Sequence, residues 1–105
     1  MGKILVKGCN KWIGVGHIDA RPVLKRTRGS IVAAFRLRVP QTFKSDDGGF
    51  ITREDAVPVV AWGALAAVVD RIAKPGVVFH VEGAVIVTSK NKSEVYAKFI
   101  EAVRD

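Results

Sequence analysis

Short apolar runs rich in Val and Ile, bounded by Gly, Pro, Asn and Asp, recur along most of the sequence. Runs of this kind predict strands. We expect strands at residues 3–7, 12–18, 31–39, 56–62, 77–87 and 96–103. In the second run Gly14 and Gly16 alternate with apolar residues, which is typical of a bent strand or of a close backbone approach. A barrel corner would need such a strand.

The expected strand at 31–39 has two chemically different faces. Side chains alternate along a strand, so Phe35 and Leu37 fall on one side. Arg36 and Arg38 fall on the other side. We therefore expect one face to join the core and the opposite face to be positively charged.

Polar segments on both sides of this strand predict turns. The cationic sequence Lys-Arg-Thr-Arg-Gly at 25–29 predicts a turn that leads into the strand, and Pro40 is expected to end the strand or to mark a bulge. The polar stretch 41–55, with a central Asp-Asp-Gly-Gly, predicts a long and flexible segment joining two strands. Its tip, flanked by Phe43 and Phe50, should extend from the body of the domain.

The apolar spacing becomes helical after residue 62. Between 64 and 73 apolar residues recur at i, i+3, i+4 and i+7, which predicts a helix, and Lys-Pro-Gly at 74–76 ends it. The order of elements predicts an all-β domain spanning 1–105. A five-stranded Greek-key barrel with one short helix between strands 3 and 4 is the economical architecture. An SH3-like barrel and a small β-sandwich fit the same pattern.

Charge adds a class of ligand to this picture. Seventeen Lys and Arg against ten Asp and Glu give a net charge of +7. A small basic domain commonly binds a polyanion, although a cationic surface that only keeps the protein soluble is the alternative. Cys9 is the single cysteine, which excludes an intramolecular disulfide and a cysteine-rich zinc site. His17 and His80 have no ligands at metal-binding spacing, so we expect no metal and no cofactor.

No catalytic constellation is visible in the sequence. It contains no Ser/His/Asp set, no Gly-rich phosphate loop and no zinc-protease motif. We therefore predict a binding protein and not an enzyme. No apolar run has the length of a signal peptide core or of a membrane span, so we expect a cytoplasmic protein without a membrane partner.

Several segments, taken in order, carry a resemblance to one family. The segment Asn-Lys-Trp-Ile-Gly-Val-Gly-His-Ile at 10–18 resembles the opening strand of bacterial single-stranded DNA-binding proteins. Ile-Val-Ala-Ala-Phe-Arg-Leu at 31–37, Val-Val-Ala-Trp-Gly-Ala-Leu-Ala at 59–66 and Val-Glu-Gly at 81–83 are similar to later segments of that family. The resemblance implies an OB-fold barrel, associated as a homo-oligomer (a tetramer or a dimer), that coats single strands in DNA replication, recombination and repair. It also implies an association with the nucleoid.

The resemblance transfers some of the family's stacking aromatics and not others. Phe43 stands where the family has a Trp, and Trp62 stands where it has a binding Phe. Ala56 occupies the position of another stacking Trp, and Asn91 lies near a further one, so two of four platforms are missing. Phe50 on the hairpin is a compensating candidate.

The sequence ends without the acidic tip through which the family recruits other proteins. In this it resembles primosomal replication protein N and the tail-less versions of phages and plasmids. The alternative function that follows is an accessory OB module whose main role is docking a replication or recombination protein. RNA binding is a third hypothesis, because it differs from DNA binding only in recognition of the 2′-OH, and competition between RNA and DNA oligomers would distinguish the two.

Single-strand binding requires cations for the phosphates and aromatic faces for the bases. The expected nucleic-acid-binding residues are Trp62, Phe43, Phe50, Arg36, Arg38, Lys25, Arg26, Arg28, Lys44, Arg53, Lys90 and Lys92. By contrast, Phe35, Phe79 and Phe99 fall on core positions of their strands. Trp12 is expected to stack on a base or to lie at a barrel edge or a subunit contact.

Overall fold

The predicted strands that fall within residues 8–103, the part of the chain that the computed structural model describes, all form strands of one sheet. The predicted strand at 3–7 lies outside the described residues. The elements follow in the order β1 (Trp12–His17), β2 (Val23–Thr27), β3 (Ser30–Lys44), β4 (Phe50–Trp62), α1 (Ala64–Ile72), β5 (Val78–Ser89) and β6 (Lys92–Ala102).

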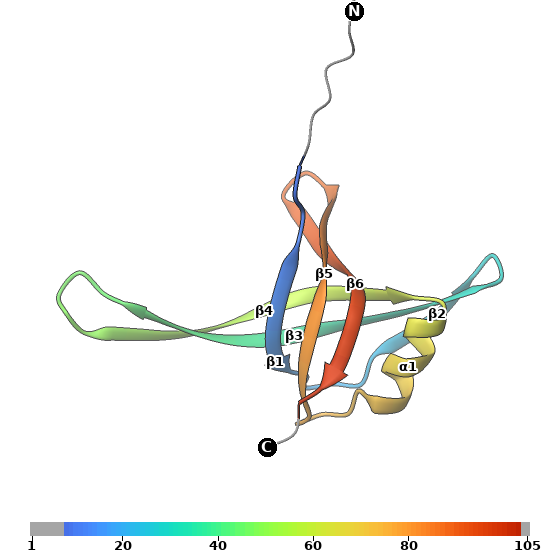
Figure 1. The fold of residues 1–105 in the computed structure, drawn as a ribbon, viewed down its shortest axis with the longest axis horizontal. Helices are drawn as coiled ribbons and strands as arrows, with labels where there is room; N and C mark the ends of the chain where they lie inside the picture. The colour runs from blue at the N-terminus through green and yellow to red at the C-terminus, as the bar shows by residue number, and fades with distance from the viewer. Residues whose placement is uncertain (1–7, 104–105) are drawn as a thin grey trace, which may run out of the picture.

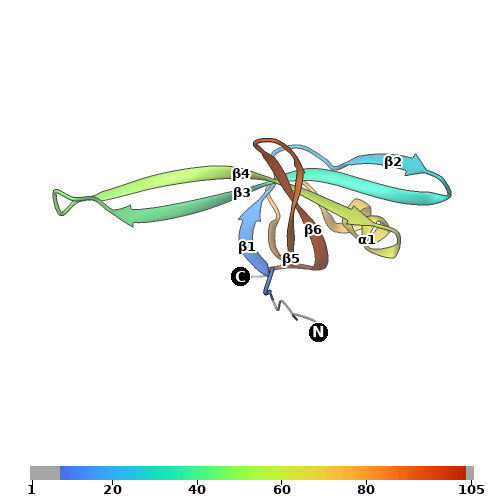
Figure 2. The ribbon, with the colours of Figure 1, turned by 90° about the horizontal axis from the view of Figure 1, so that it is seen from above.

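The strand order in the sheet is β1-β5-β6-β4-β3-β2, and β1 pairs in addition with β3. This second pairing, between His17 and Arg38, brings the first strand back to the middle of the sheet and closes the barrel (Figure 1). β4 and β6 run parallel, and the other pairings are antiparallel. The bodies of β1, β5 and β6 and helix α1 lie on one side of the β3–β4 ladder (Figure 2). The predicted all-β barrel of the OB type is confirmed.

The barrel has one strand more than predicted within the described residues. The segment expected as a turn at 25–29 is mostly part of β2, which pairs with the first part of β3. The turn itself is confined to Arg28 and Gly29, which both have positive φ. Consequently α1 lies between the fourth and fifth strands and not between the third and fourth. The hydrophobic pattern did not predict β2. It is an edge strand with every residue exposed, so cations are tolerated and apolar residues do not alternate with polar ones.

β3 and β4 form a long, regular hairpin that extends far from the barrel (Figure 1). The prediction that Pro40 ends the strand or marks a bulge is wrong, since Pro40 pairs with Glu54 in an unbroken register. Past Arg38 the described part of β3 has β4 as its single neighbour, so a residue without an N–H can face the open edge. The stretch 41–55, expected to be flexible, is likewise strand apart from its tip at 45–49. The extension of the tip is as predicted.

The core forms where the sheet and α1 meet, and its members follow the predicted alternation. Leu37 and Ala61 are fully buried, and α1 contributes Ala66 and Val69. Gly16 allows β1 to approach β3 closely: a Cβ atom at this position would lie 2.1 Å from the carbonyl oxygen of Arg38. The predicted barrel corner therefore exists and depends on glycine. Within residues 8–103 no helix has the length and apolar character needed to cross a membrane.

Phe99 differs from the other two phenylalanines expected in the core. Phe35 and Phe79 are buried, whereas Phe99 is 46% exposed. The register between β5 and β6 shifts at Gly83, and Lys98 becomes an extra residue in β6. Because an inserted residue reverses which side chains point inward, the bulge turns Phe99 away from the core to the exposed side of β5 and β6. The prediction of a core position for Phe99 is thus wrong.

Candidate nucleic-acid interface

The uncovered side of β2, β3 and β4, together with the start of β6, forms a continuous surface that we call the outer face. Cross-strand pairing arranges its side chains in rows. One row runs from Lys25 through Val32 to Trp62. A second row contains Arg36 and Pro58. Sheet pairing therefore places an aromatic residue and two cations, from three segments of the chain, on one surface.

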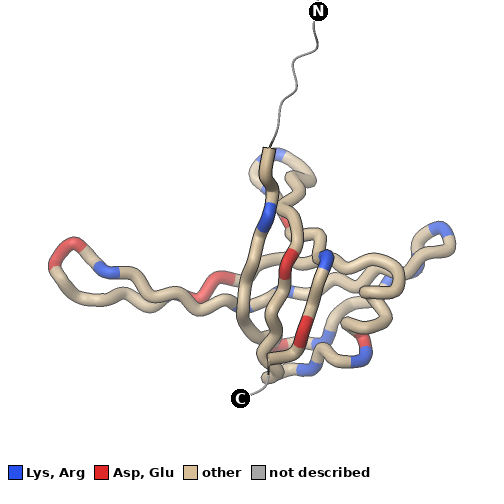
Figure 3. The backbone as a smooth tube through the Cα atoms, viewed as in Figure 1, with Lys and Arg blue, Asp and Glu red and all other residues tan. Residues whose placement is uncertain are grey.

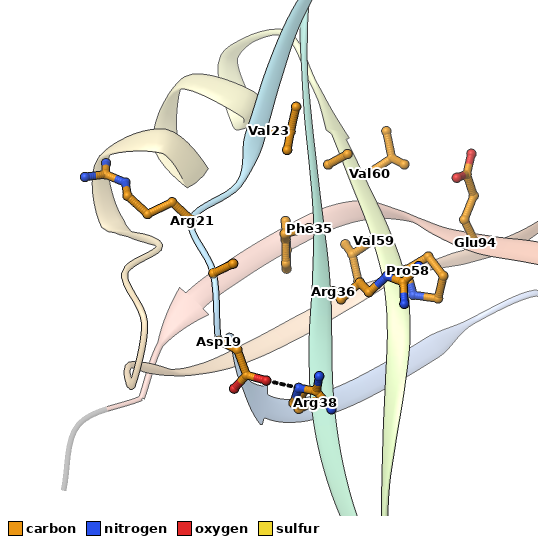
Figure 4. Close-up of a pocket in the computed structure, with 12 residues that line it drawn as sticks. Asp19, Arg21, Val23, Phe35, Arg36, Arg38, Pro58, Val59, Val60 and Glu94 are labelled. Atoms are coloured by element: carbon orange, nitrogen blue, oxygen red, sulfur yellow. Dashed lines mark ion pairs between the residues drawn. The ribbon is translucent and has the colours of Figure 1, made fainter.

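The outer face contains a hollow of about 350 Å³ (Figure 4). Its apolar floor includes Val23, Ala34, Pro58 and Val60. Its charged side chains are Asp19, Arg21, Arg36, Arg38 and Glu94. A surface with an apolar floor and a charged rim suits a flat heteroaromatic group with polar edges.

Trp62 ends β4 at one end of this surface, and 45% of it is exposed. Its ring centroid lies 6.4 Å from that of Tyr96, and the two ring planes are inclined by 49°. Tyr96 of β6 comes beside Trp62 because the residues at 60 and 96 pair in the parallel ladder. Tyr96 was not among the predicted site residues. Alternation next to buried Val95 could have shown that Tyr96 points away from the core. The sequence does not show which strand pairs with β6, so it could not place Tyr96 beside Trp62.

Arg38 lies on the outer face as predicted, but two carboxylates already bind its guanidinium. Its Nε contacts Asp19, and its Nη1 lies 3.6 Å from Glu54. His17 completes the group, with its Nε2 3.7 Å from Asp19 and 3.9 Å from Glu54. The positive charge of Arg38 is therefore largely balanced within the protein.

The hairpin divides its predicted site residues between two sides. In the unbroken β3–β4 register Lys44 pairs with Phe50, and both share the strand phase of Arg36 on the outer face. Phe43 and Arg53 have the opposite phase. Phe50 is 74% exposed, so it is available for stacking near the tip of the outer face.

Arg53 is held on the other side of the hairpin by its own strand. Its Nε donates a hydrogen bond of 2.6 Å to Asp55, whose second carboxylate oxygen accepts one of the same length from Gln41. Arg53 is thus paired, like Arg38. The predicted cations that form no ion pair among residues 8–103 are Lys25, Arg26, Arg28, Arg36, Lys44, Lys90 and Lys92.

The remaining predicted cations lie at or beside the ends of hairpins, where Figure 3 shows blue segments. Arg28 lies in the β2–β3 turn, whereas Arg26 has the strand phase opposite to that of Lys25. Lys90 and Lys92 flank Asn91, which has positive φ, at the β5–β6 turn. Cationic tips around an apolar face can hold a flexible anionic chain at several points.

The tip of the β3–β4 hairpin is a defined turn. Ser45 donates a hydrogen bond through its hydroxyl to Asp47, and the amide of Gly49 donates one of 3.0 Å to the same carboxylate oxygen. These two hydrogen bonds, the first being the larger cause, lower the pKa of Asp47 from its ordinary value of 3.8. The turn therefore fixes the Asp47 carboxylate by hydrogen bonds. Residues 8–103 contain no group of three or more His, Cys, Asp or Glu side chains that could hold a metal ion.

Comparison with known proteins yields one family and a set of structures. The model of the single-strand binding protein family matches residues 9–102. A search of curated proteins finds no match.

The similar structures share the fold at low sequence identity. A deletion mutant of the single-stranded DNA-binding protein from Thermus aquaticus has a TM-score of 0.82 and 22% identity, with 92% of this chain and 51% of that chain covered. This chain thus spans about half the length of that structure. Protein PriB from Ralstonia solanacearum has a TM-score of 0.76 and 20% identity, with 92% and 100% covered. The Plasmodium falciparum SSB complex with ssDNA has a TM-score of 0.81 and 16% identity, with 96% and 100% covered.

Proposed function

The chain belongs to the single-strand binding protein family, and from that premise we propose that it binds single-stranded DNA across the outer face without catalysing a reaction. The observation that carries the proposal is the alignment of exposed Trp62 with Lys25 in one row, next to the guanidinium of Arg36, which forms no ion pair with residues 8–103. Unpaired bases stack on aromatic rings while cations hold the phosphates between them. The Plasmodium falciparum SSB with the same fold is described in complex with ssDNA.

Binding of this kind tolerates most sequences. Every base has a π-face that can stack on Trp62 at one end of the outer face or on Phe50 near the other. Lys25 and Lys44 contact phosphates, which are identical at every nucleotide. The finer role that we propose is to cover single strands during replication, recombination or repair.

Fluorescence titration with oligo-dT tests the proposal. Stacking on Trp62 should quench its emission, and Trp62→Ala should abolish the quenching although Trp12, packed against the core, still fluoresces. Two phosphate contacts by Lys25 and Lys44 should give a slope of about −1.4 in log K against log salt. Absence of quenching, or an affinity that does not depend on salt, would contradict the proposal.

We also propose that the protein is a homo-oligomer, and that a second copy covers the outward side of β1, β5 and β6. This side exposes Ile13, Val15 and Phe99, each of them about half accessible. Apolar residues clustered on a sheet face in this way are typical of contacts between subunits. Size-exclusion chromatography with light scattering should give a dimer or a tetramer, and Val15→Glu should dissociate it. A wild-type monomer would refute this part.

The alternative function is that of an accessory module that docks a replication or recombination protein. The likeness to PriB along the full length of that chain favours it. Weak binding of oligo-dT together with tight binding of a replicative helicase or a recombinase would support this alternative over the first proposal.

A further inference from the structure

Glu94 is an unexpected residue on a surface that attracts an anionic ligand. It is half-buried, lines the hollow, and forms no ion pair with residues 8–103. The carboxylates of Asp19 and Glu54, by contrast, both form ion pairs with Arg38. A carboxylate repels phosphates but accepts hydrogen bonds, so a ligand group that contacts Glu94 should be a hydrogen-bond donor.

The sheet places Glu94 opposite a cation across an apolar floor. Arg36 on β3 pairs with Pro58 on β4, and Glu94 precedes the two β4–β6 pairs that start at Val59. Adjacent strands are about 4.8 Å apart, so Arg36 and Glu94 begin about 10 Å from each other, with Pro58 between them. Figure 4 shows this arrangement, with Arg36 beside Pro58 and Glu94 beyond it.

We propose that this hollow holds one base of the bound strand and prefers guanine to thymine, an inference that rests on the proposed single-strand binding. A base lying on Pro58 and Val60 would direct one edge to Arg36 and another to Glu94. Guanine fits both groups: its O6 and N7 accept hydrogen bonds from a guanidinium, and its N1–H and 2-amino group donate to a carboxylate. The hollow of about 350 Å³ has room for one base.

Thymine fits the same pair of groups poorly. It has no amino group, and the carbonyl oxygens on both sides of its N3–H would face the Glu94 carboxylate. A buried or half-buried acceptor without a donor is costly, so this mismatch is a source of discrimination. Stacking on Trp62 and phosphate contacts elsewhere on the outer face would continue to bind any sequence.

The experiment compares a thymine oligonucleotide with the same oligonucleotide carrying isolated guanines, spaced to prevent quadruplex formation. The wild-type protein should bind the guanine-containing strand at least about fivefold more tightly. Replacing guanine with inosine, which lacks the 2-amino group, should remove most of that advantage. Glu94→Gln should also remove it and should tighten binding of the thymine strand, because a charge that repels phosphates is gone.

Asp70→Asn is the matched control, since it also replaces a carboxylate with its amide, at an exposed position of α1 that lies on neither the outer face nor the proposed subunit contact. It should keep the preference for guanine. Equal affinity of the wild-type protein for both strands would overturn this inference and leave the proposed function intact. A preference that survives both inosine and Glu94→Gln would overturn the assignment to this hollow. Failure to bind either strand would instead refute single-strand binding itself.

Discussion

Asp19 and Glu54 compete with phosphates for Arg38, so a variant with Asp19→Asn and Glu54→Gln should bind single-stranded DNA more tightly and with a steeper dependence on salt. In the wild-type protein these carboxylates occupy the Nε and Nη1 sides of the guanidinium. Their removal makes one more cation available on the outer face. The single variants should have smaller effects, because either carboxylate alone can still bind Arg38.

The magnitude follows from counterion release. Each additional phosphate contact on a single strand adds about −0.7 to the slope of log K against log salt. Between about 50 and 200 mM salt, one such contact changes the affinity by about 2.6-fold. The ratio of affinities at these two salt concentrations should therefore be about 2.6 times larger for the double variant than for the wild-type protein.

Fluorescence anisotropy of a labelled oligo-dT, measured over this salt range, provides the slopes. The fold should survive, since partly exposed ion pairs of this kind contribute about 0–1 kcal/mol to the free energy of unfolding. Asp70→Asn controls for the loss of a negative charge, because it removes an exposed carboxylate from α1, away from the outer face and from the proposed subunit contact. An unchanged slope in the double variant, or an equal increase in Asp70→Asn, would refute the competition between these carboxylates and DNA.

Three other changes test separate parts of the structure. Trp62→Ala should weaken oligo-dT binding by about 1–3 kcal/mol through loss of stacking, as measured by anisotropy; undiminished affinity would place the stacking elsewhere. Gly16→Ala places a Cβ atom 2.1 Å from the carbonyl oxygen of Arg38, and urea unfolding should show a loss of about 1–3 kcal/mol, whereas an unchanged midpoint would mean that β1 can shift freely. Asp47 should titrate below 3.8 by NMR, so its ionised form stabilises the tip above that pH and the stabilisation disappears as pH falls through the lowered pKa. Ser45→Ala should raise this pKa toward 3.8, and a midpoint that does not move would exclude the hydroxyl as the cause.

The candidate site was predictable from the sequence in its parts but not in its grouping. Alternation along β3 correctly separated Arg36 and Arg38 from the core side chains. It could not show that Arg38 is paired with Asp19 and Glu54, because these three residues meet through the closure of β1 onto β3. Tyr96 was missed for a related reason, since a parallel pairing of β4 with β6 has no local signature.

The sequence by itself determined the all-β class, the helix after Trp62, the glycine-dependent barrel corner and the basic character of the surface, because periodicity, turn residues and charge are local properties of the chain. Tertiary structure alone decided how far the long hairpin extends, where Phe99 points and which cations remain unpaired. Each of these depends on strand register and on contacts between residues far apart in the chain. One extra residue in β6 was enough to move Phe99 from the core to the surface.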